Sequence, residues 1–274
     1  MRAQDIHSYL YYRHTLPVRV MHWINVVALT ILMMSGLQIF NAHPALYWAK
    51  SSYSGKPPLL QITSRNDDVA GPIGVTRVFG YEFNSTGVLG LREHNGRLQS
   101  LAFPGWITIP GYYSLAEARS WHFFFAWVFV LNGITYLLYS IYSRHLTRDL
   151  LPTRPELKTI SVSIKDHLLL RHPTGDASRR YNVLQKLAYV AVIFILLPLV
   201  ILMGWAMSPW LDSILPGWVD LFGGRQAART IHFIVAWLLV AFVLIHVFEV
   251  IVSGLWNHMR SMITGQYRVK EQAR

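Results

Sequence analysis

Four of the twelve histidines in this sequence lie inside long apolar stretches. They are His22, His122, His232 and His246. An imidazole in such a place can bind a metal, carry a proton or hydrogen-bond across a helix interface. An ionisable side chain is costly inside an apolar helix, so it usually faces other helices and marks a functional site. We therefore expect the function to centre on these four imidazoles.

The two histidines of the last apolar stretch share one helical face. His232 and His246 are fourteen residues apart, so on a helix they point within about 40° of each other and are separated by about 21 Å along the axis. His22 and His122 each lie near the start of their own stretch. Helices that cross a membrane in alternating directions then match these depths in two pairs, His22 with His246 and His122 with His232.

The chain contains no cysteine, which excludes disulfides, cysteine-bound zinc, iron–sulfur clusters and covalently attached c-type haem. Two facing imidazoles instead suit a b-type haem held at both axial positions, and this ligation favours electron transfer. We predict two b-type haems, ligated by His22 with His246 and by His122 with His232. The other eight histidines are interpreted as surface residues: His7, His14, His43, His94, His145, His167, His172 and His258.

An arginine stands three residues before three of these histidines, at Arg19, Arg119 and Arg229. The spacing places each guanidinium on the face of its histidine, one turn nearer the helix start. There it can pair with a haem propionate, because a guanidinium matches a carboxylate in charge and shape. An arginine at a helix start can also be a plain interfacial anchor.

Two glycines lie on the faces that carry these histidines. Gly36 follows His22 by fourteen residues and Gly133 follows His122 by eleven, so each lies within about 40° of its histidine's direction. They could leave room for a flat macrocycle, or they could serve ordinary close packing between membrane helices.

The elements that position these residues are four apolar helices. Only 14% of residues are charged, against roughly 25% in soluble domains. A membrane-spanning helix needs about 20 mainly apolar residues, and four stretches qualify, at about 18–41, 119–143, 184–208 and 230–256. The sequence therefore predicts an all-α integral membrane protein, with one membrane domain over 1–274 built as a four-helix bundle. The net charge of +11 does not indicate a nucleic-acid partner, because the basic residues lie between the apolar stretches.

Basic residues predict the orientation in the membrane. The connection from Arg144 to Lys186 has nine basic and four acidic residues, and the N-terminal flank and C-terminal tail are also basic. Basic flanks stay in the cytoplasm, so both termini are predicted there, in a bacterial inner membrane. Residues 42–118 then form an extended outer, periplasmic cap. The alternation from Val75 to Phe83 predicts a short hairpin in that cap.

Several motifs resemble a known family. They are the Arg-x-x-His-Trp segment Arg19–Trp23, the other Arg-x-x-His helix starts, the fourteen-residue histidine pair and the segment Tyr181–Lys186. Together they are similar to the membrane cytochrome b subunits of nickel–iron hydrogenases, formate dehydrogenases and thiosulfate reductases. The segments Asn41–Pro44 and Phe222–Arg229 most resemble the thiosulfate-reductase type. The connection after the first helix departs from the family, being much longer than in the formate dehydrogenase subunit.

The resemblance implies a function and partners. It implies haem ligation by the four histidines and a quinone site near the cytoplasmic haem, where Asn182, Gln185 and Lys186 could hydrogen-bond a quinone carbonyl or a propionate, or could form an interfacial polar cap. It also implies a molybdenum-containing oxidoreductase as partner on the outer side. Glu249, three residues after His246, could accept the proton released by a quinol or could pair with a nearby basic residue.

The leading hypothesis is therefore a respiratory electron-transfer subunit that links membrane quinone to a periplasmic redox partner and is not a complete enzyme alone. One alternative is a stand-alone haem oxidoreductase acting on a small molecule such as a ferric chelate or superoxide, which a co-purifying second subunit would exclude. The other is a proton-coupled transporter that uses the membrane histidines as relays. That reading predicts a colourless protein and fits poorly with a chain that shows no internal repeat.

Overall fold

The computed structural model describes residues 6–52, 55–94, 96–169 and 179–272. The chain divides into two units. The first unit comprises residues 1–25, 131–198 and 237–274, and the second comprises residues 26–130 and 199–236. Of the histidines singled out above, His172 lies outside the described residues. Each unit contains one of the two predicted histidine pairs.

Four helices are long and apolar enough to cross a membrane. They are α1 (Leu16–Asn41), α2 (Leu115–Tyr142), the continuous run of α5 (Val183–Ala191), η4 (Val192–Leu196) and α6 (Leu197–Ala206), and α8 (Arg225–Val252). The predicted class of membrane helical bundle is confirmed. The helices begin one to five residues before the predicted positions, because the prediction stopped at the charged flanks and a helix continues through them.

Local backbone features end these helices. Gly254, with φ of +115°, separates α8 from α9 (Leu255–Thr264), so the last helix stops four residues before the predicted 256. Pro209 stands at the first position of α7 (Pro209–Ile214), where its missing N–H costs nothing. The third membrane helix is interrupted within its length. Its middle segment, η4, is a π-helical turn.

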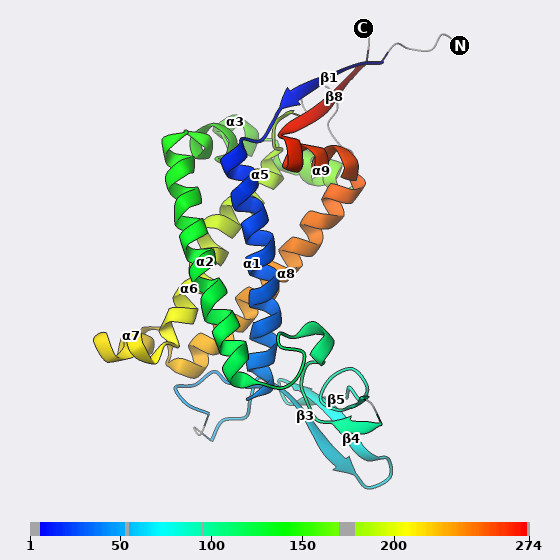
Figure 1. The fold of residues 1–274 in the computed structure, drawn as a ribbon, viewed down its shortest axis with the longest axis vertical. Helices are drawn as coiled ribbons and strands as arrows, with labels where there is room; N and C mark the ends of the chain where they lie inside the picture. The colour runs from blue at the N-terminus through cyan, green and yellow to red at the C-terminus, as the bar shows by residue number, and fades with distance from the viewer. Residues whose placement is uncertain (1–5, 53–54, 95, 170–178, 273–274) are drawn as a thin grey trace. The chain divides into compact units, whose positions relative to one another are not determined.

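The first unit ties the two ends of the described chain together. Strand β1 (Ile6–Tyr12) pairs antiparallel with β8 (Gln266–Gln272), and Figure 1 shows these strands side by side, next to α9. The Arg13 backbone N–H donates to Gly265 O at 2.8 Å. The sequence gives no local signal for this sheet, because its two strands come from opposite ends of the chain.

The connection between the second and third helices in this unit is also ordered where it is described. It contains η2 (Leu146–Leu150), α3 (Arg154–Leu157) and α4 (Ile160–Leu168). Thr153 and Glu156 form a capping box at the start of α3. The Glu156 carboxylate also accepts two hydrogen bonds from Lys186 Nζ, at 2.8 and 3.0 Å. Since the Lys186 side chain is only 6% exposed, this pair fixes the connection to α5.

The second unit contains the cap. Strands β2 (Ala45–Leu46), β3 (Leu60–Asp67), β4 (Gly71–Val78) and β5 (Tyr81–Asn84) form one antiparallel sheet in that order. The hairpin predicted over Val75–Phe83 is confirmed as β4–β5. Further along are the strand pair β6 (Arg92–His94) and β7 (Arg97–Gln99), η1 (Gly105–Ile107) and, before α8, η5 (Trp218–Phe222).

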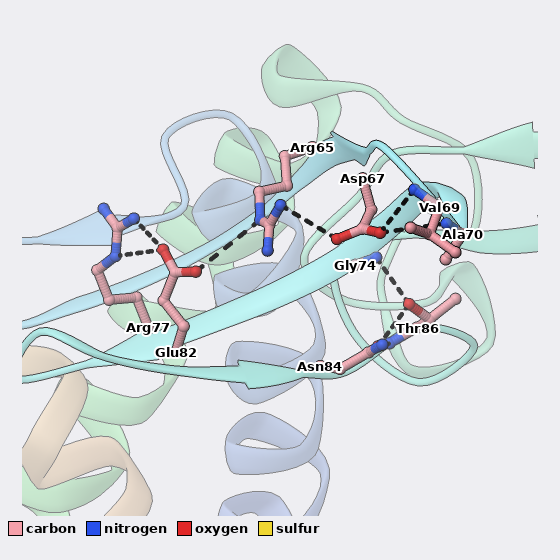
Figure 2. Close-up of polar contacts among 9 residues, drawn as sticks. All are labelled: Arg65, Asp67, Val69, Ala70, Gly74, Arg77, Glu82, Asn84 and Thr86. Atoms are coloured by element: carbon pink, nitrogen blue, oxygen red, sulfur yellow. Dashed lines mark hydrogen bonds and ion pairs between the residues drawn. The ribbon is translucent and has the colours of Figure 1, made fainter.

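One face of the sheet carries a row of charges, shown in Figure 2. Glu82 accepts from Arg77 and lies 3.8 Å from Arg65 Nε, and Arg65 in turn lies 3.5 Å from Asp67. Asp67 also accepts from the backbone N–H groups of Val69 and Ala70, and these hydrogen bonds lower the pKa of its carboxyl. These contacts link β3, β4 and β5 through their side chains, on a face of the sheet that also carries the buried Ile73 and Val75.

The sheet packs on the end of α1 through Leu46 and Ile62. The core here consists of Leu37, Phe40, Leu46, Ile62, Ala102 and Phe103. Asn41, buried at the last position of α1, accepts from the Phe103 backbone N–H at 2.7 Å and donates to Phe103 O at 3.2 Å. The polar groups at the helix end are thereby satisfied, and the cap is held in place beside the helix that also carries Ser35 and Gly36.

The Lys186–Glu156 pair leads to a stability prediction. Glu156→Gln leaves a buried ammonium without its counter-ion, which typically costs about 3 kcal/mol. We expect a clearly lower melting temperature for purified Glu156→Gln at pH 7, measured by circular dichroism. Lys186 lowers the pKa of Glu156 below its usual 4.5, so the stabilisation is present above pH 4.5 and is lost as the carboxyl protonates in acid. Glu93→Gln, which removes an exposed carboxylate, should melt like the parent, and equal melting of both variants would contradict the role of the pair.

Candidate functional site

In the first unit, His22 of α1 faces His246 of α8. Their ring centroids are 6.4 Å apart and the ring planes make an angle of 65°. Phe242, one turn before His246, stacks on its ring at 6.0 Å with an interplanar angle of 17°. Trp23 meets His22 edge-on at 5.6 Å. Aromatic neighbours thus limit how each imidazole can rotate.

In the second unit, His122 of α2 faces His232 of α8 with nearly the same geometry. The centroids are 6.2 Å apart and the interplanar angle is 64°. The four histidines therefore lie in the two pairs expected from their depths. Among the described residues, no group of three or more His, Cys, Asp or Glu side chains could hold a metal ion, so the candidate metal chemistry is that of two-imidazole ligation.

The spacing in both pairs fits two imidazoles on opposite sides of one iron. With metal–nitrogen bonds of about 2 Å and each ring centre about 1.1 Å behind its nitrogen, the centres would be about 6 Å apart. Edge-to-face rings in direct contact also have centroids about 4.5–7 Å apart. The observed 6.2 and 6.4 Å are therefore compatible with two-imidazole ligation, and the hydrogen bonds of the rings must be considered beside the spacing.

Hydrogen bonds in the His122–His232 pair also suit ligation. His122 Nδ1 lies 3.2 Å from Leu32 O and 3.1 Å from Ser35 Oγ, and His232 Nδ1 lies 2.9 Å from Val200 O. A carbonyl can only accept, so each Nδ1 carries the proton. Each Nε2 is then left as a lone pair, which is the state a metal-bound histidine requires.

Glycines make room for these two rings. A Cβ built on Gly36 would lie 3.5 Å from His122, and one built on Gly204 would lie 3.6 Å from His232. Gly36 was selected from the sequence because of its position relative to His22, and in the structure it lies against His122. Gly204 was not selected, because its helix carries no histidine to mark its face. Gly133 has open space around its Cβ direction.

The three arginines before the histidines have different surroundings. Arg19 donates to Ile263 O of α9, and Arg229 donates to the carbonyls of His43 and Ala45. Arg119 is exposed and lies 5.6 Å from the Phe123 ring. Arg19 and Arg229 therefore connect histidine-bearing helices to the neighbouring surface segments, and the structure gives none of the three a carboxylate partner among the described residues.

The residues considered for quinone binding have local partners. Asn182 and Gln185 form the capping box that starts α5, with Gln185 N donating to Asn182 Oδ1 at 2.8 Å. Lys186 is paired with Glu156, as described above. These contacts correspond to the interfacial-cap alternative, although a hydrogen-bonding amide can accept a second partner.

Glu249 contacts a histidine that was interpreted as a surface residue. Its Oε1 lies 3.2 Å from His167 Nε2 of α4, and the side chains are 17% and 32% exposed. This contact matches the pairing alternative raised for Glu249. No local pattern could reveal it, since 82 residues separate the two side chains in the sequence.

Other histidines of the first unit are also less exposed than expected. Burial, together with the positive charge of Arg13, lowers the pKa of His14 to about 3. His145 Nδ1 lies 2.7 Å from Asp149, and His258 Nε2 lies 3.0 Å from Ser253 Oγ. His14, His145 and His258 are half-buried, while His43 and His94 are exposed as predicted.

One buried residue beside the first pair was missed. Asn132 of α2 donates at 2.8 Å both to Met21 O and to Asn25 Oδ1 of α1. Met21 directly precedes His22, so this amide fixes the backbone next to a paired histidine. An uncharged polar residue within an apolar stretch was the available signal, but asparagine within a membrane helix more often marks helix contact than a site.

Comparison with known proteins supplies the family. A family model described as prokaryotic cytochrome b561 matches residues 13–265. The chain belongs to this family. It is thus a multi-pass membrane protein of the cytochrome b type that binds b-type haem and transfers electrons, and the resemblance to membrane cytochrome b subunits is confirmed. It is also 28% identical, over 238 residues, to a protein of Azospira oryzae (strain ATCC BAA-33 / DSM 13638 / PS) described as "Putative protein-methionine-sulfoxide reductase subunit YedZ1". The alignment covers 87% of this chain and 89% of that protein.

The glycines of this cytochrome b561 lead to a second prediction. Alanine at position 36 or 204 would place its Cβ at ordinary contact distance from the adjacent imidazole, so Gly36→Ala and Gly204→Ala should keep the parent haem content. Gly36→Leu and Gly204→Leu should lose part of it, because the longer side chain needs the volume of the ring. Soret absorbance per mole of purified protein measures this. Full haem content in both leucine variants would show that the glycines do not make room for the rings.

Proposed function

We propose that this cytochrome b561 is a dihaem electron-transfer subunit that links membrane quinone to a redox enzyme on the outer side of a bacterial inner membrane. The observation that carries the proposal is the presence of two imidazole pairs at the spacing of axial ligation, in a chain without cysteine. In this proposal His22 and His246 hold one b-type haem, and His122 and His232 hold the other.

In this proposal some residues bind the haem and others orient the ligands. The four imidazoles bind through Nε2, and the carbonyls of Leu32 and Val200 keep two of them in the required tautomer. Haem with both axial positions filled supplies one-electron transfer and no open position for substrate. Arg19, Arg119 and Arg229 are the residues proposed to neutralise propionates, since a guanidinium with five donors can hold a carbonyl and a carboxylate together.

A proton acceptor is needed where quinol is oxidised, because each quinol that becomes a quinone releases two electrons and two protons. We assign this role to Glu249, which lies one turn beyond His246 on α8. His167 of α4 lies 3.2 Å from Glu249. Its imidazole could accept the quinol proton from the Glu249 carboxylate. Asn182, Gln185 and Lys186, at the start of α5 in the same unit, are the proposed polar groups for the quinone.

The relative supports a partner enzyme. It is described as a subunit of a protein-methionine-sulfoxide reductase, and we propose that this chain likewise serves a separate catalytic subunit, a molybdenum-containing oxidoreductase on the outer side. The cap of 42–118 offers that subunit an ordered surface. The paired strands β1 and β8 support an orientation with both termini on one side of the membrane, and the basic flanks favour the cytoplasmic side.

The haem assignment predicts the outcome of a pigment assay. A pyridine haemochrome assay on the purified protein should give two b haems per chain. His246→Ala should remove one haem and His122→Ala the other, because each variant destroys one pair. His94→Ala, which changes an exposed histidine outside both pairs, should keep two. Loss of both haems, or of neither, in the paired-histidine variants would contradict this pairing.

If Glu249 accepts the proton of quinol, replacing it should slow haem reduction without changing the haem spectrum. Glu249→Gln should slow haem reduction by a soluble quinol analogue tenfold or more, in line with the about 10²–10⁴-fold contribution of general acid–base groups. The dithionite-reduced spectrum should be unchanged. Stopped-flow absorbance across pH 6–8 measures the rate. Asp166→Asn, beside His167 on α4, is the matched control and should behave as the parent, while equal rates for parent and Glu249→Gln would assign the carboxylate to the structural pair alone.

A further inference from the structure

Ser35 of α1 lies directly against one of the paired imidazoles in the second unit. Its Oγ is 3.1 Å from His122 Nδ1, and the residue is fully buried. The next residue, Gly36, lies against the same ring. Two consecutive residues of α1 thus provide a polar and a steric contact for a histidine on α2.

The proton positions around Ser35 follow from its partners. The hydroxyl donates to Ile31 O at 2.6 Å, a carbonyl that can only accept. Its oxygen therefore keeps its lone pairs for the imidazole, and His122 Nδ1–H donates both to Ser35 Oγ and to Leu32 O. This arrangement places the free lone pair of His122 on Nε2.

The serine distinguishes His122 from the other paired histidines. His232 donates to a backbone carbonyl alone, that of Val200. Within the described parts of the chain, neither His22 nor His246 has a hydrogen-bond partner on its ring, and Ser35 is the one side chain that hydrogen-bonds to any of the four rings. The His122–His232 pair therefore has three acceptors on its two Nδ1 atoms, and the His22–His246 pair has none.

We propose that Ser35 is a positioning residue that gives the Nδ1–H of His122 a second acceptor beside Leu32 O and lowers the reduction potential of the haem held by His122 and His232. An acceptor on Nδ1 makes the imidazole a more basic ligand. A more basic ligand stabilises ferric iron relative to ferrous iron, so the potential falls. The inference rests on the proposed haem ligation and adds a difference between the two haems that the ligands alone do not give.

The test is a potentiometric titration of the purified dihaem protein, with Ser35→Ala as the main variant. Removing the hydroxyl should raise the midpoint potential of one haem and leave the other unchanged. The low-temperature electron paramagnetic resonance signal of that same haem should shift, because its axial field changes. Ser143→Ala is the matched control, since Ser143 makes the same hydrogen bond to the carbonyl four residues earlier, at 2.7 Å to Tyr139 O, and contacts none of the paired histidines. It should titrate like the parent.

Two further variants make the result specific. In a His246→Ala background only the His122–His232 haem should remain, and Ser35→Ala should raise its potential there as well. If Ser35→Ala fails to hold haem, Ser35→Cys fills nearly the same volume with a weaker acceptor, and its potential should also rise, by less than expected for full loss.

The outcomes separate this inference from the proposed function. Unchanged potentials and resonance signals in Ser35 variants that retain two haems would overturn the role of Ser35 and leave the dihaem proposal intact. A shift confined to the haem that survives in His122→Ala would also overturn it. Full haem content in His122→Ala itself would instead overturn the proposed ligation.

Discussion

The structure depends on imidazoles held within apolar helices. Transferring a polar nitrogen from water to such a place is unfavourable unless it is hydrogen-bonded or bound to a metal. In the His122–His232 pair, each ring has one nitrogen hydrogen-bonded to a carbonyl, and the ring centroids lie 6.2 Å apart. In the proposed function, a metal ion between the two remaining lone pairs would supply the missing interaction. Two nitrogen ligands on one haem would leave no position for substrate, which favours electron transfer.

Much of the surrounding chain holds the paired helices in register. Asn132 donates to the backbone before His22, Arg19 holds a carbonyl of α9, and Arg229 holds two carbonyls of the segment that leads into β2. These interactions share one feature, a side-chain donor on a helix and a backbone carbonyl acceptor elsewhere. The bond from Asn132 to Met21 O is buried, so water does not compete for either group there. Two of the arginines predicted to pair with propionates, Arg19 and Arg229, therefore also hold backbone carbonyls of neighbouring segments.

The sequence predicted the membrane helices well because an apolar stretch of about 20 residues is long enough to span a bilayer and is rare in soluble proteins. It predicted the histidine pairs because a period of 3.6 residues converts spacing into direction and depth. It predicted the β4–β5 hairpin from local alternation. Ser35, Gly204 and His167 could not be found in this way: serine and glycine are common in membrane helices, and the contact of His167 with Glu249 joins distant segments.

The sequence by itself determined the membrane helices and the absence of cysteine ligands, because these follow from residue type and apolar length along the chain. It also predicted the pairing of the four imidazoles, since helices that cross a membrane in alternating directions match their depths. Only the tertiary structure decided which imidazole nitrogens are protonated, which glycines meet the rings, and which side chains contact Lys186 and Glu249. These features depend on side chains that approach from other helices at about 3 Å. These contacts between helices are set by how the elements pack, and they cannot be predicted from the sequence of one element.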